Sequence, residues 1–321
     1  MPGLKIVFCG TGDLAVPALR AVVAAARDQV LAVVAQPPRL AGRGRKLTEC
    51  PAALAAQELH LPLLQPEDVN DPDDAQAVAA VEALRPDVVV VAAYGQFLRK
   101  RFLGAARLGT INIHPSLLPK YRGATPMQRT LENGDPETGV SILYVTPRMD
   151  AGDLLDQSRT PVGPAETYPA LAARLADQGA RQLLDVLDRF RDAQAPLAGT
   201  LQDDALAVPA PRLDKADGRV DWTLPARRIF NRWRAFLAWP GSAAALPDGT
   251  PLKLLDLDWR PDAPPPSAIP GQVLAADAAS LSVATGEGTL RILAAQPAGK
   301  GAMPAGALVN GRRVAVGDVL G

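Results

Sequence analysis

Short, continuously apolar runs alternate with helical patterns through the first two-thirds of the chain. The runs are rich in valine, isoleucine and leucine, which is typical of strands buried on both faces of a sheet. They cover Leu4–Cys9, Val30–Ala35, Asp87–Ala93, Thr110–Ile113 and Val140–Val145. Between them, apolar residues recur at helical spacing over Leu14–Ala26, Pro51–Leu59 and Asp73–Leu84. The alternation indicates βαβ units and predicts a doubly wound, mainly parallel sheet with helices on both faces.

The pattern changes after a long amphipathic stretch, Tyr168–Arg191, which is predicted to be the helix that closes this first domain. The next residues, Ala193–Asp221, are rich in proline, aspartate and glycine, as is typical of a linker region. A short helix is predicted around Ala226–Leu237. Short strand candidates follow it, over Leu252–Leu257, Gln272–Leu274, Leu281–Ala284, Thr289–Leu293 and Arg312–Val316. Because no long helix separates them, they predict a small β-barrel.

Length and composition agree with two domains in one chain. We place the first domain at residues 1–192, a linker at 193–210 and the barrel domain at 211–321. The charge is balanced, with 34 basic and 34 acidic residues, so a nucleic-acid partner would have to bind a local basic patch. The two cysteines, Cys9 and Cys50, form neither a disulfide framework nor a metal-binding pattern.

The amino-terminal segment runs straight into the first predicted strand. It lacks the charged region, apolar stretch and cleavage site of a signal peptide. The chain also has no apolar run near the roughly 18 to 20 residues that span a bilayer. We therefore expect a soluble protein in a reducing, cytoplasmic setting, without a membrane partner.

A glycine-containing loop, Gly10–Gly12, lies between the first predicted strand and the first predicted helix, where a dinucleotide-binding loop would lie. Such a site also needs an acidic residue at the end of the second strand to bind the ribose hydroxyls. That position, Ala35–Pro38, has no carboxylate. We therefore expect no nicotinamide cofactor and attribute the glycines to the tight turn. A helix N-terminus here could still receive a carboxylate or phosphate.

Candidate chemistry is concentrated after the fourth apolar run. Asn112 and His114 stand two residues apart on a predicted strand, so both side chains point to the same face near its carboxyl end. Ligands of open parallel sheets bind just outside that end. Asp150 follows the next strand and could orient the imidazole and favour its protonated form. The alternatives are a hydrogen-bonded core histidine and a turn-forming aspartate. His60, the other histidine, is interpreted as a surface residue.

The residues around this set carry a specific resemblance. Residues 112–123 read Asn-Ile-His-Pro-Ser-Leu-Leu-Pro-Lys-Tyr-Arg-Gly, and residues 150–153 read Asp-Ala-Gly-Asp. Together with Ala93–Gln96 after the preceding strand, these motifs resemble the family of 10-formyltetrahydrofolate-dependent formyltransferases. The resemblance implies an enzyme that transfers a formyl group from 10-formyltetrahydrofolate, as co-substrate, to an amine. It also implies that Asn112, His114 and Asp150 are catalytic.

The implied chemistry suits these residues. When the amine attacks the formyl carbon, negative charge develops on the formyl oxygen, and the Asn112 amide and the His114 imidazolium could stabilise it. Asp150 would support the cationic imidazolium and help to shuttle the amine proton. No metal is required, and the sequence shows no metal-ligand cluster. By resemblance, the folate pocket is lined by Tyr94, Ser116, Leu117, Leu118 and Pro119.

A basic loop, Arg39–Lys46, holds four cations in eight residues and no acidic residue. It resembles the loop that inserts into the tRNA acceptor stem in family members that formylate methionyl-tRNA, except that Pro38 stands where many relatives have an aspartate. This resemblance implies methionyl-tRNA as the acceptor in translation initiation and a C-terminal domain that binds tRNA. The implied tRNA contacts are Arg39, Arg43, Arg45 and Lys46. The alternative is a solvated basic loop without function.

Other acceptors stay open at this point. Glycinamide ribonucleotide formyltransferases normally consist of the catalytic domain alone, and some sugar-nucleotide formyltransferases carry a C-terminal extension. A third alternative is a non-catalytic RNA-binding protein with a decayed site. Phosphate contacts by individual basic residues of the C-terminal domain carry little weight, because an exposed helix face would look the same; these residues are Arg227, Arg228, Arg232, Arg234 and Lys300. In sum we predict an α/β protein, a monomer, with a Rossmann-like catalytic domain and a smaller OB-like β-barrel.

Overall fold

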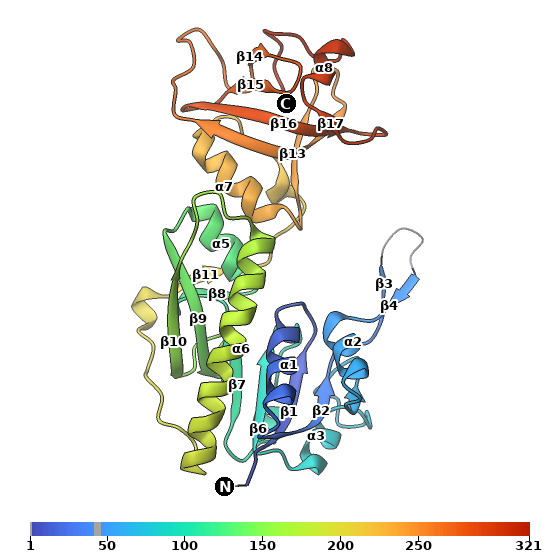
Figure 1. Ribbon diagram of the computed structural model, residues 1–321, viewed down its shortest axis with the longest axis vertical. Helices are drawn as coiled ribbons and strands as arrows, with labels where there is room; N and C mark the ends of the chain where they lie inside the picture. The colour runs from blue at the N-terminus through green and yellow to red at the C-terminus, as the bar shows by residue number, and fades with distance from the viewer. Residues whose placement is uncertain (1, 42–45) are drawn as a thin grey trace. The chain divides into compact units, whose positions relative to one another are not determined.

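A seven-stranded sheet is the centre of the first of two units into which the chain folds (Figure 1). The computed structural model describes residues 2–41 and 46–321. The strands of this sheet are β1 (Lys5–Gly10), β2 (Gln29–Val34), β5 (Leu63–Leu64), β6 (Val88–Ala92), β7 (Thr110–His114), β9 (Glu137–Tyr144) and β10 (Leu154–Pro161). Their order is β10-β9-β7-β6-β1-β2-β5. The strands from β7 to β5 run parallel, whereas β9 is antiparallel to both of its neighbours.

Helices cover both faces of this sheet, as the apolar runs predict. The helices of the unit are α1 (Ala15–Ala25), α2 (Pro51–Glu58), α3 (Val78–Leu84), α4 (Lys100–Leu103) and α6 (Tyr168–Ala193). On one face, buried side chains of β1, β2 and β6 form a cluster with Val81 of α3 and Phe102 of α4. On the other face, α6 packs so closely that a Cβ on Gly179 would lie 2.8 Å from Ile113. Side chains alternate along β7, so its polar residues point away from α6.

Two short strand pairs lie outside the central sheet. β3 (Arg39–Ala41) pairs antiparallel with β4 (Lys46–Thr48), and Figure 1 shows this hairpin projecting from the helices around α2. β8 (Lys120–Gly123) pairs in parallel with β11 (Val208–Ala210). The predicted linker, residues 193–210, therefore belongs to the first unit, where a 3-10 turn over Asp204–Leu206 precedes β11.

The second unit comprises residues 127–136, 162–170 and 211–321. Its strands are β12 (Ser242–Ala245), β13 (Pro251–Arg260), β14 (Val273–Ala276), β15 (Leu281–Ala284), β16 (Thr289–Pro297) and β17 (Met303–Pro304). They form an antiparallel sheet in the order β12-β13-β16-β15-β14, with β17 paired to β16. The helices are α5 (Pro126–Asn133), α7 (Ala226–Phe236) and α8 (Ala307–Asn310). Ile229, Phe230 and Trp233 of α7 are buried in the core of this sheet.

The carboxyl end of the chain closes this sheet on itself. The backbone oxygen of Asp318 accepts a hydrogen bond from Val273 of β14 at 2.8 Å. Three residues later, Gly321 pairs through both of its backbone groups with Ala245 of β12, at 2.7 and 2.9 Å. The last residues therefore bridge the two outermost strands, and the unit is a small barrel. The predicted fold class is confirmed.

A buried carboxylate holds α5 to α7 within this unit. Glu132 of α5 is 4% exposed. It accepts hydrogen bonds from Arg129, at 2.6 Å, and from Arg232 of α7, at 2.9 Å. Arg228, one turn earlier on α7, donates to the backbone oxygen of Glu132 at 2.7 Å. A charge removed from water this far is stable only when it is paired in this way. The sequence segment 127–136 is thus tied to the C-terminal unit.

The structure differs from the predicted elements in several places. Arg312–Val316 is not a strand: it consists of turns after α8, with Arg312 at φ 52° and Val316 59% exposed. The helix predicted from Asp73 begins only at Val78, because aspartate side chains accept backbone hydrogen bonds in the preceding turns. β10 was not predicted because it is an edge strand rich in polar residues. No helix within the described ranges is long and apolar enough to cross a membrane.

The barrel closure makes a prediction about the last residues. Leu320 is 1% exposed and its neighbour Val319 is 40% exposed. Leu320→Ala should lower the free energy of unfolding by about 2–4 kcal/mol, because it leaves a cavity in the core. Val319→Ala, the matched control, should change it by less than about 1 kcal/mol. Chemical denaturation followed by fluorescence measures both. Equal small effects would show that the carboxyl end does not belong to the barrel core.

Candidate functional site

Asn112, His114 and Asp150 come together at one end of the central sheet. β7 ends at His114, and Asp150 lies in the turn that follows β9, its antiparallel neighbour. The Asn112 Nδ2 lies 3.4 Å from Asp150 Oδ1. The His114 Nδ1 lies 3.6 Å from Asp150 Oδ2. Both distances are long for hydrogen bonds, so neither donor is fully engaged by the carboxylate. Catalytic hydrogen bonds are often this loose before the substrate binds.

The ring of His114 is fixed from its other side. Its Nε2 lies 3.0 Å from the backbone oxygen of Tyr121, and the residue is only 3% exposed. A carbonyl oxygen accepts hydrogen bonds and never donates them, so this contact requires a proton on Nε2. The other ring nitrogen, Nδ1, faces Asp150. The Tyr121 carbonyl thus sets both the orientation and the tautomer of the imidazole.

Asp150 occupies a demanding backbone position. Its φ is 49°, in the left-handed region that a residue with a side chain rarely adopts. Its Oδ2 accepts a hydrogen bond from the backbone amide of Gly123 at 2.8 Å. The side chain is 14% exposed. Strained backbone of this kind is found where the surrounding contacts hold it, often at functional sites.

The predicted folate-binding turn, residues 116–119, is rigid in the structure. The Ser116 hydroxyl donates to the backbone oxygen of Lys120 at 2.7 Å. The Ser141 hydroxyl of β9 donates to the backbone oxygen of Ser116 at 2.7 Å and accepts from the amide of Leu118 at 3.2 Å. Leu118 is buried, whereas Leu117 and Pro119 are half-buried. The turn therefore presents apolar side chains from a backbone that several hydrogen bonds hold in place.

Tyr94 is placed differently from the rest of the predicted folate pocket. Its side chain is 2% exposed and lies in the core cluster between the sheet and α3. Its hydroxyl has no hydrogen-bond partner among the described residues, and burial raises its pKa above the ordinary value for tyrosine. Its backbone oxygen accepts from Thr11 Oγ1 at 2.7 Å and from Gln36 Nε2 at 3.1 Å. Tyr94 thus ties together the loops after β1, β2 and β6.

The basic loop is described only in part. Arg43 and Arg45 lie outside the described residues. Arg39 forms an exposed ion pair with Glu67 at 2.9 Å, with 62% of its side chain exposed. Lys46 is exposed at the start of β4. The two described cations thus belong to a surface hairpin, which leaves them accessible to a macromolecule.

Several arginines considered as phosphate contacts are bound within the second unit. Arg228 and Arg232 contact Glu132, as described above. Arg234 is 3% exposed and donates to the backbone oxygen of Gly163 at 2.9 Å; burial lowers its pKa. Arg227 lies over the ring of Trp259, 5.9 Å from its centre. Three of these residues therefore have structural roles: Arg228, Arg232 and Arg234. The spacing of the basic residues in the sequence does not reveal these roles.

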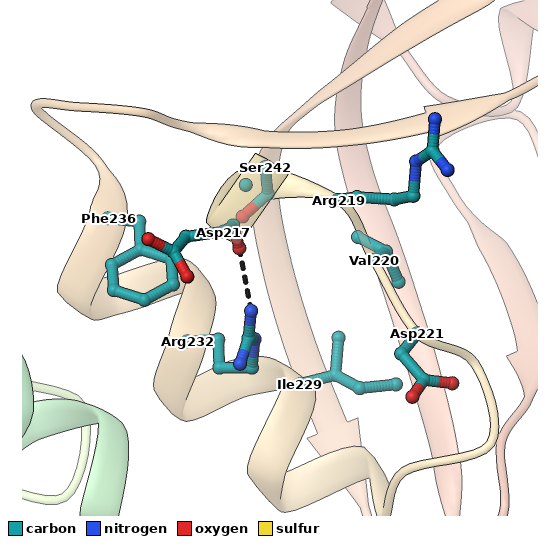
Figure 2. Close-up of a pocket in the computed structure, with 9 residues that line it drawn as sticks. Asp217, Arg219, Val220, Asp221, Ile229, Arg232, Phe236 and Ser242 are labelled. Atoms are coloured by element: carbon teal, nitrogen blue, oxygen red, sulfur yellow. Dashed lines mark hydrogen bonds between the residues drawn. The ribbon is translucent and has the colours of Figure 1, made fainter. Parts of the chain in front are cut away.

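A small hollow near these arginines is shown in Figure 2. Asp217, Ile229, Arg232 and Phe236 line it, and Arg232 donates a hydrogen bond across it to the backbone oxygen of Asp217 at 2.6 Å. Its volume of about 10 Å³ holds about one water molecule. It is therefore too small for a folate or an aminoacyl group. No group of three or more His, Cys, Asp or Glu side chains within the described part of the chain could hold a metal ion.

Comparison with known proteins identifies the family. The formyl transferase profile matches residues 4–187, and the profile of the formyl transferase C-terminal domain matches residues 212–313. A methionyl-tRNA formyltransferase of Roseiflexus sp. (strain RS-1) is 43% identical over 318 residues, which cover 99% of this chain and 95% of the relative. The chain belongs to the methionyl-tRNA formyltransferase family. The family and the enzyme class predicted from the sequence are thereby confirmed.

Further relatives agree with this assignment. A methionyl-tRNA formyltransferase of Methylococcus capsulatus is 40% identical over 315 residues, 97% of this chain and 98% of the relative. An N-formyltransferase from Helicobacter canadensis, solved with folinic acid and dTDP-3-aminofucose, has a TM-score of 0.64 at 15% identity and covers 92% of this chain and 99% of its own. HypX from Aquifex aeolicus, solved with tetrahydrofolic acid, has a TM-score of 0.62 at 17% identity, over 97% of this chain and 47% of its own. These two structures share the fold.

Some residues at this site have no signal in the sequence. The Tyr121 carbonyl and the Gly123 amide act through the backbone, so their side chains do not mark them. Gln202 contacts the backbone of Asp150 and Gly152 from the segment predicted to be a linker. A polar residue in a loop rich in aspartate and proline looks like ordinary surface. The return of that loop to the sheet edge is visible only in three dimensions.

Proposed function

We propose that the protein transfers the formyl group of 10-formyltetrahydrofolate to the α-amino group of methionyl-tRNA, which then serves in translation initiation. The observation that carries the proposal is the convergence of Asn112 and His114 on Asp150 in a chain of this family. The folate is the co-substrate, and the reaction needs neither a metal nor a nicotinamide cofactor. The protein acts as a monomer.

The first step is attack of the amine nitrogen on the formyl carbon. The carbonyl electron pair moves to the formyl oxygen, which becomes an oxyanion. Asn112 Nδ2 and His114 Nδ1 both point toward one small region beside Asp150, and an oxygen placed there accepts from both. Preorganised donors of this kind stabilise the transition state without reorganising during the reaction.

Proton movement completes the transfer. The attacking amine becomes positively charged when the new carbon–nitrogen bond forms, and it must lose a proton. Asp150 accepts this proton, directly or through His114 Nδ1, because its carboxylate is the nearest base to both donors. The bond from carbon to the folate nitrogen then breaks, and that nitrogen takes up the proton that Asp150 received from the amine. The carbonyl of the new formamide re-forms from the oxyanion.

The turn at residues 116–119 is proposed to form a wall of the folate pocket. Leu117 and Pro119 offer half-buried apolar surface, and the turn is fixed by the hydroxyls of Ser116 and Ser141. Ligand pockets combine such apolar walls with a few well-placed polar groups. Tyr94 contributes through its backbone, because its ring lies in the core.

Incubation with a panel of acceptors tests the proposed function. The protein is mixed with 10-formyltetrahydrofolate and with methionyl-tRNA, glycinamide ribonucleotide or an amino-sugar nucleotide, and the formylated product is measured. We expect formyl transfer to methionyl-tRNA alone. Transfer to the sugar nucleotide or the ribonucleotide, and not to methionyl-tRNA, would overturn the proposed acceptor while keeping the formyl-transfer chemistry.

Substitutions at the site test the roles of its residues. His114→Ala and Asp150→Asn should each lower kcat by about 100- to 1,000-fold, because each removes a group that acts in the transition state. His60→Ala is the matched control, since it removes the other histidine and should leave kcat unchanged. Circular dichroism checks that the fold survives. A near-normal kcat in either site variant would exclude that residue from the mechanism.

The basic loop is proposed to bind the phosphates of tRNA through Arg39, Arg43, Arg45 and Lys46. Replacing Arg43 and Arg45 by glutamine should weaken tRNA binding and make the slope of log K against log salt shallower by about 1 to 2. Each phosphate contact that is lost lowers the number of counterions that binding releases. The control replaces Lys5, an exposed cation at the amino end of β1, and Arg85, an exposed cation at the end of α3. Filter binding at several salt concentrations measures both. An unchanged slope in the loop variant would show a loop without phosphate contacts.

A further inference from the structure

The segment of the first unit that follows α6, residues 194–210, returns to Asp150. After α6, the hydroxyl of Tyr144 contacts the backbone of Leu197 at 2.8 and 3.1 Å. Thr200 then pairs with Leu154, the first residue of β10, through two backbone hydrogen bonds of 2.8 Å. These contacts fix the segment on both sides of the turn that carries Asp150. Gln202 is thereby brought to the outside of that turn.

The amide of Gln202 uses all of its hydrogen-bonding capacity there. Its Nε2 donates to the backbone oxygen of Asp150 at 2.8 Å and to that of Gly152 at 2.7 Å. Its Oε1 accepts from Arg122 Nε at 3.1 Å and Nη2 at 2.8 Å. A primary amide offers two donors and one oxygen with two acceptor sites. All four are satisfied, and both donors are directed to the strained turn.

Arg122 is itself held from a second direction. Its Nη1 pairs with Asp204 at 2.8 Å, and the same carboxylate pairs with Arg148 at 2.9 Å. These two arginines hold the pKa of the Asp204 carboxyl below its usual range. Arg148 precedes Asp150 by two residues. The segment therefore contacts the turn at three residues. Asp204 pairs with Arg148, and Gln202 donates to the backbone oxygens of Asp150 and Gly152.

We propose that Gln202 is a positioning residue for Asp150 in the formyl transfer. The inference rests on the proposed function for its catalytic consequence. Asp150 needs such support because its backbone is in the left-handed region, and because its carboxylate must stay near His114 Nδ1, 3.6 Å away. A shift of about 1 Å in a catalytic group can cost on the order of 100-fold in rate. Gln202 itself is not expected to contact either substrate.

Two substitutions separate the contacts of Gln202. Gln202→Ala removes all four hydrogen bonds. Gln202→Glu keeps the partner of Arg122 but replaces both donors by an oxygen that repels the carbonyls of Asp150 and Gly152. Both variants should lower kcat by about 10- to 100-fold and leave the KM for methionyl-tRNA within about 2-fold, since the loss lies in the transition state. A normal kcat in Gln202→Glu would overturn the proposal, whatever happens to stability.

Gln178→Ala is the matched control. Gln178 lies on α6 and donates through its amide to the backbone oxygen and the hydroxyl of Ser158, at 3.3 and 2.6 Å. Its loss removes hydrogen bonds between a helix and β10 without touching the Asp150 turn. Its kcat should stay within about 2-fold of the parent value. A loss of kcat equal to that of Gln202→Ala would make the effect one of general stability and overturn the proposal.

A double-mutant cycle tests whether Gln202 acts through Asp150. Single-turnover rates are measured for Gln202→Ala, Asp150→Ala and the combination. If Gln202 positions Asp150, its removal should cost less than about 2-fold once the carboxylate is absent, because interacting residues are not additive. The same 10- to 100-fold loss in both backgrounds would show that Gln202 acts on something else.

Hydrogen exchange tests the inference without any activity. In Gln202→Ala the amides of residues 148–153 should exchange at least about 10-fold faster, while those of β1 keep their protection. Unchanged protection of the turn would overturn the inference while the proposed function stands. Faster exchange of the turn in a protein that formylates no methionyl-tRNA would instead refute the proposed function and keep the structural role of Gln202.

Discussion

The proposed catalytic site depends on how the imidazole of His114 is held between two oxygens. The carbonyl of Tyr121 fixes Nε2, and the carboxylate of Asp150 faces Nδ1. Neither oxygen would be in place without a particular backbone: Tyr121 has φ 69° and Asp150 has φ 49°. Two residues other than glycine thus adopt left-handed backbone conformations, and each places an oxygen beside the imidazole ring of His114. The antiparallel strand β9 ends opposite Ile111 of β7, and the turn that follows it brings Asp150 back beside Asn112 and His114.

Five strands of the central sheet were predictable because most of their residues are buried and apolar. β1, β2, β6, β7 and β9 are buried enough that their sequences are runs of valine, isoleucine and leucine, and each predicted run matches a strand within a few residues. Where burial is one-sided, that signal fails. β10 carries polar residues at Asp156, Gln157 and Ser158, and it is recognised only by its pairing with β9. At the other extreme, Arg312–Val316 has strand-forming residues but only one buried apolar side chain, Val314.

The candidate site was predictable in its side chains and not in its backbone. The spacing of Asn112 and His114 places them on one face of a strand, and the motif around them points to formyl transfer. The Gly123 amide and the Tyr121 carbonyl have no residue-type signature, since every residue carries these groups. The basic residues of α7, in contrast, have a clear signature in the sequence, but it suggests the wrong role. Their charge suggests a solvent-facing patch, whereas Arg234 is buried and Arg232 neutralises Glu132.

The pairing of Glu132 with α7 constrains how this architecture can be recombined. Glu132 lies within the stretch matched by the N-terminal family profile, yet its partners Arg228 and Arg232 lie in the stretch matched by the C-terminal profile. A chimera joined anywhere between these stretches takes its acid from one parent and its bases from the other. If the second parent lacks cations at positions 228 and 232, the buried carboxylate of Glu132 keeps only Arg129 as an ionic partner. The two halves of the gene are therefore interchangeable only between parents that share this ionic match.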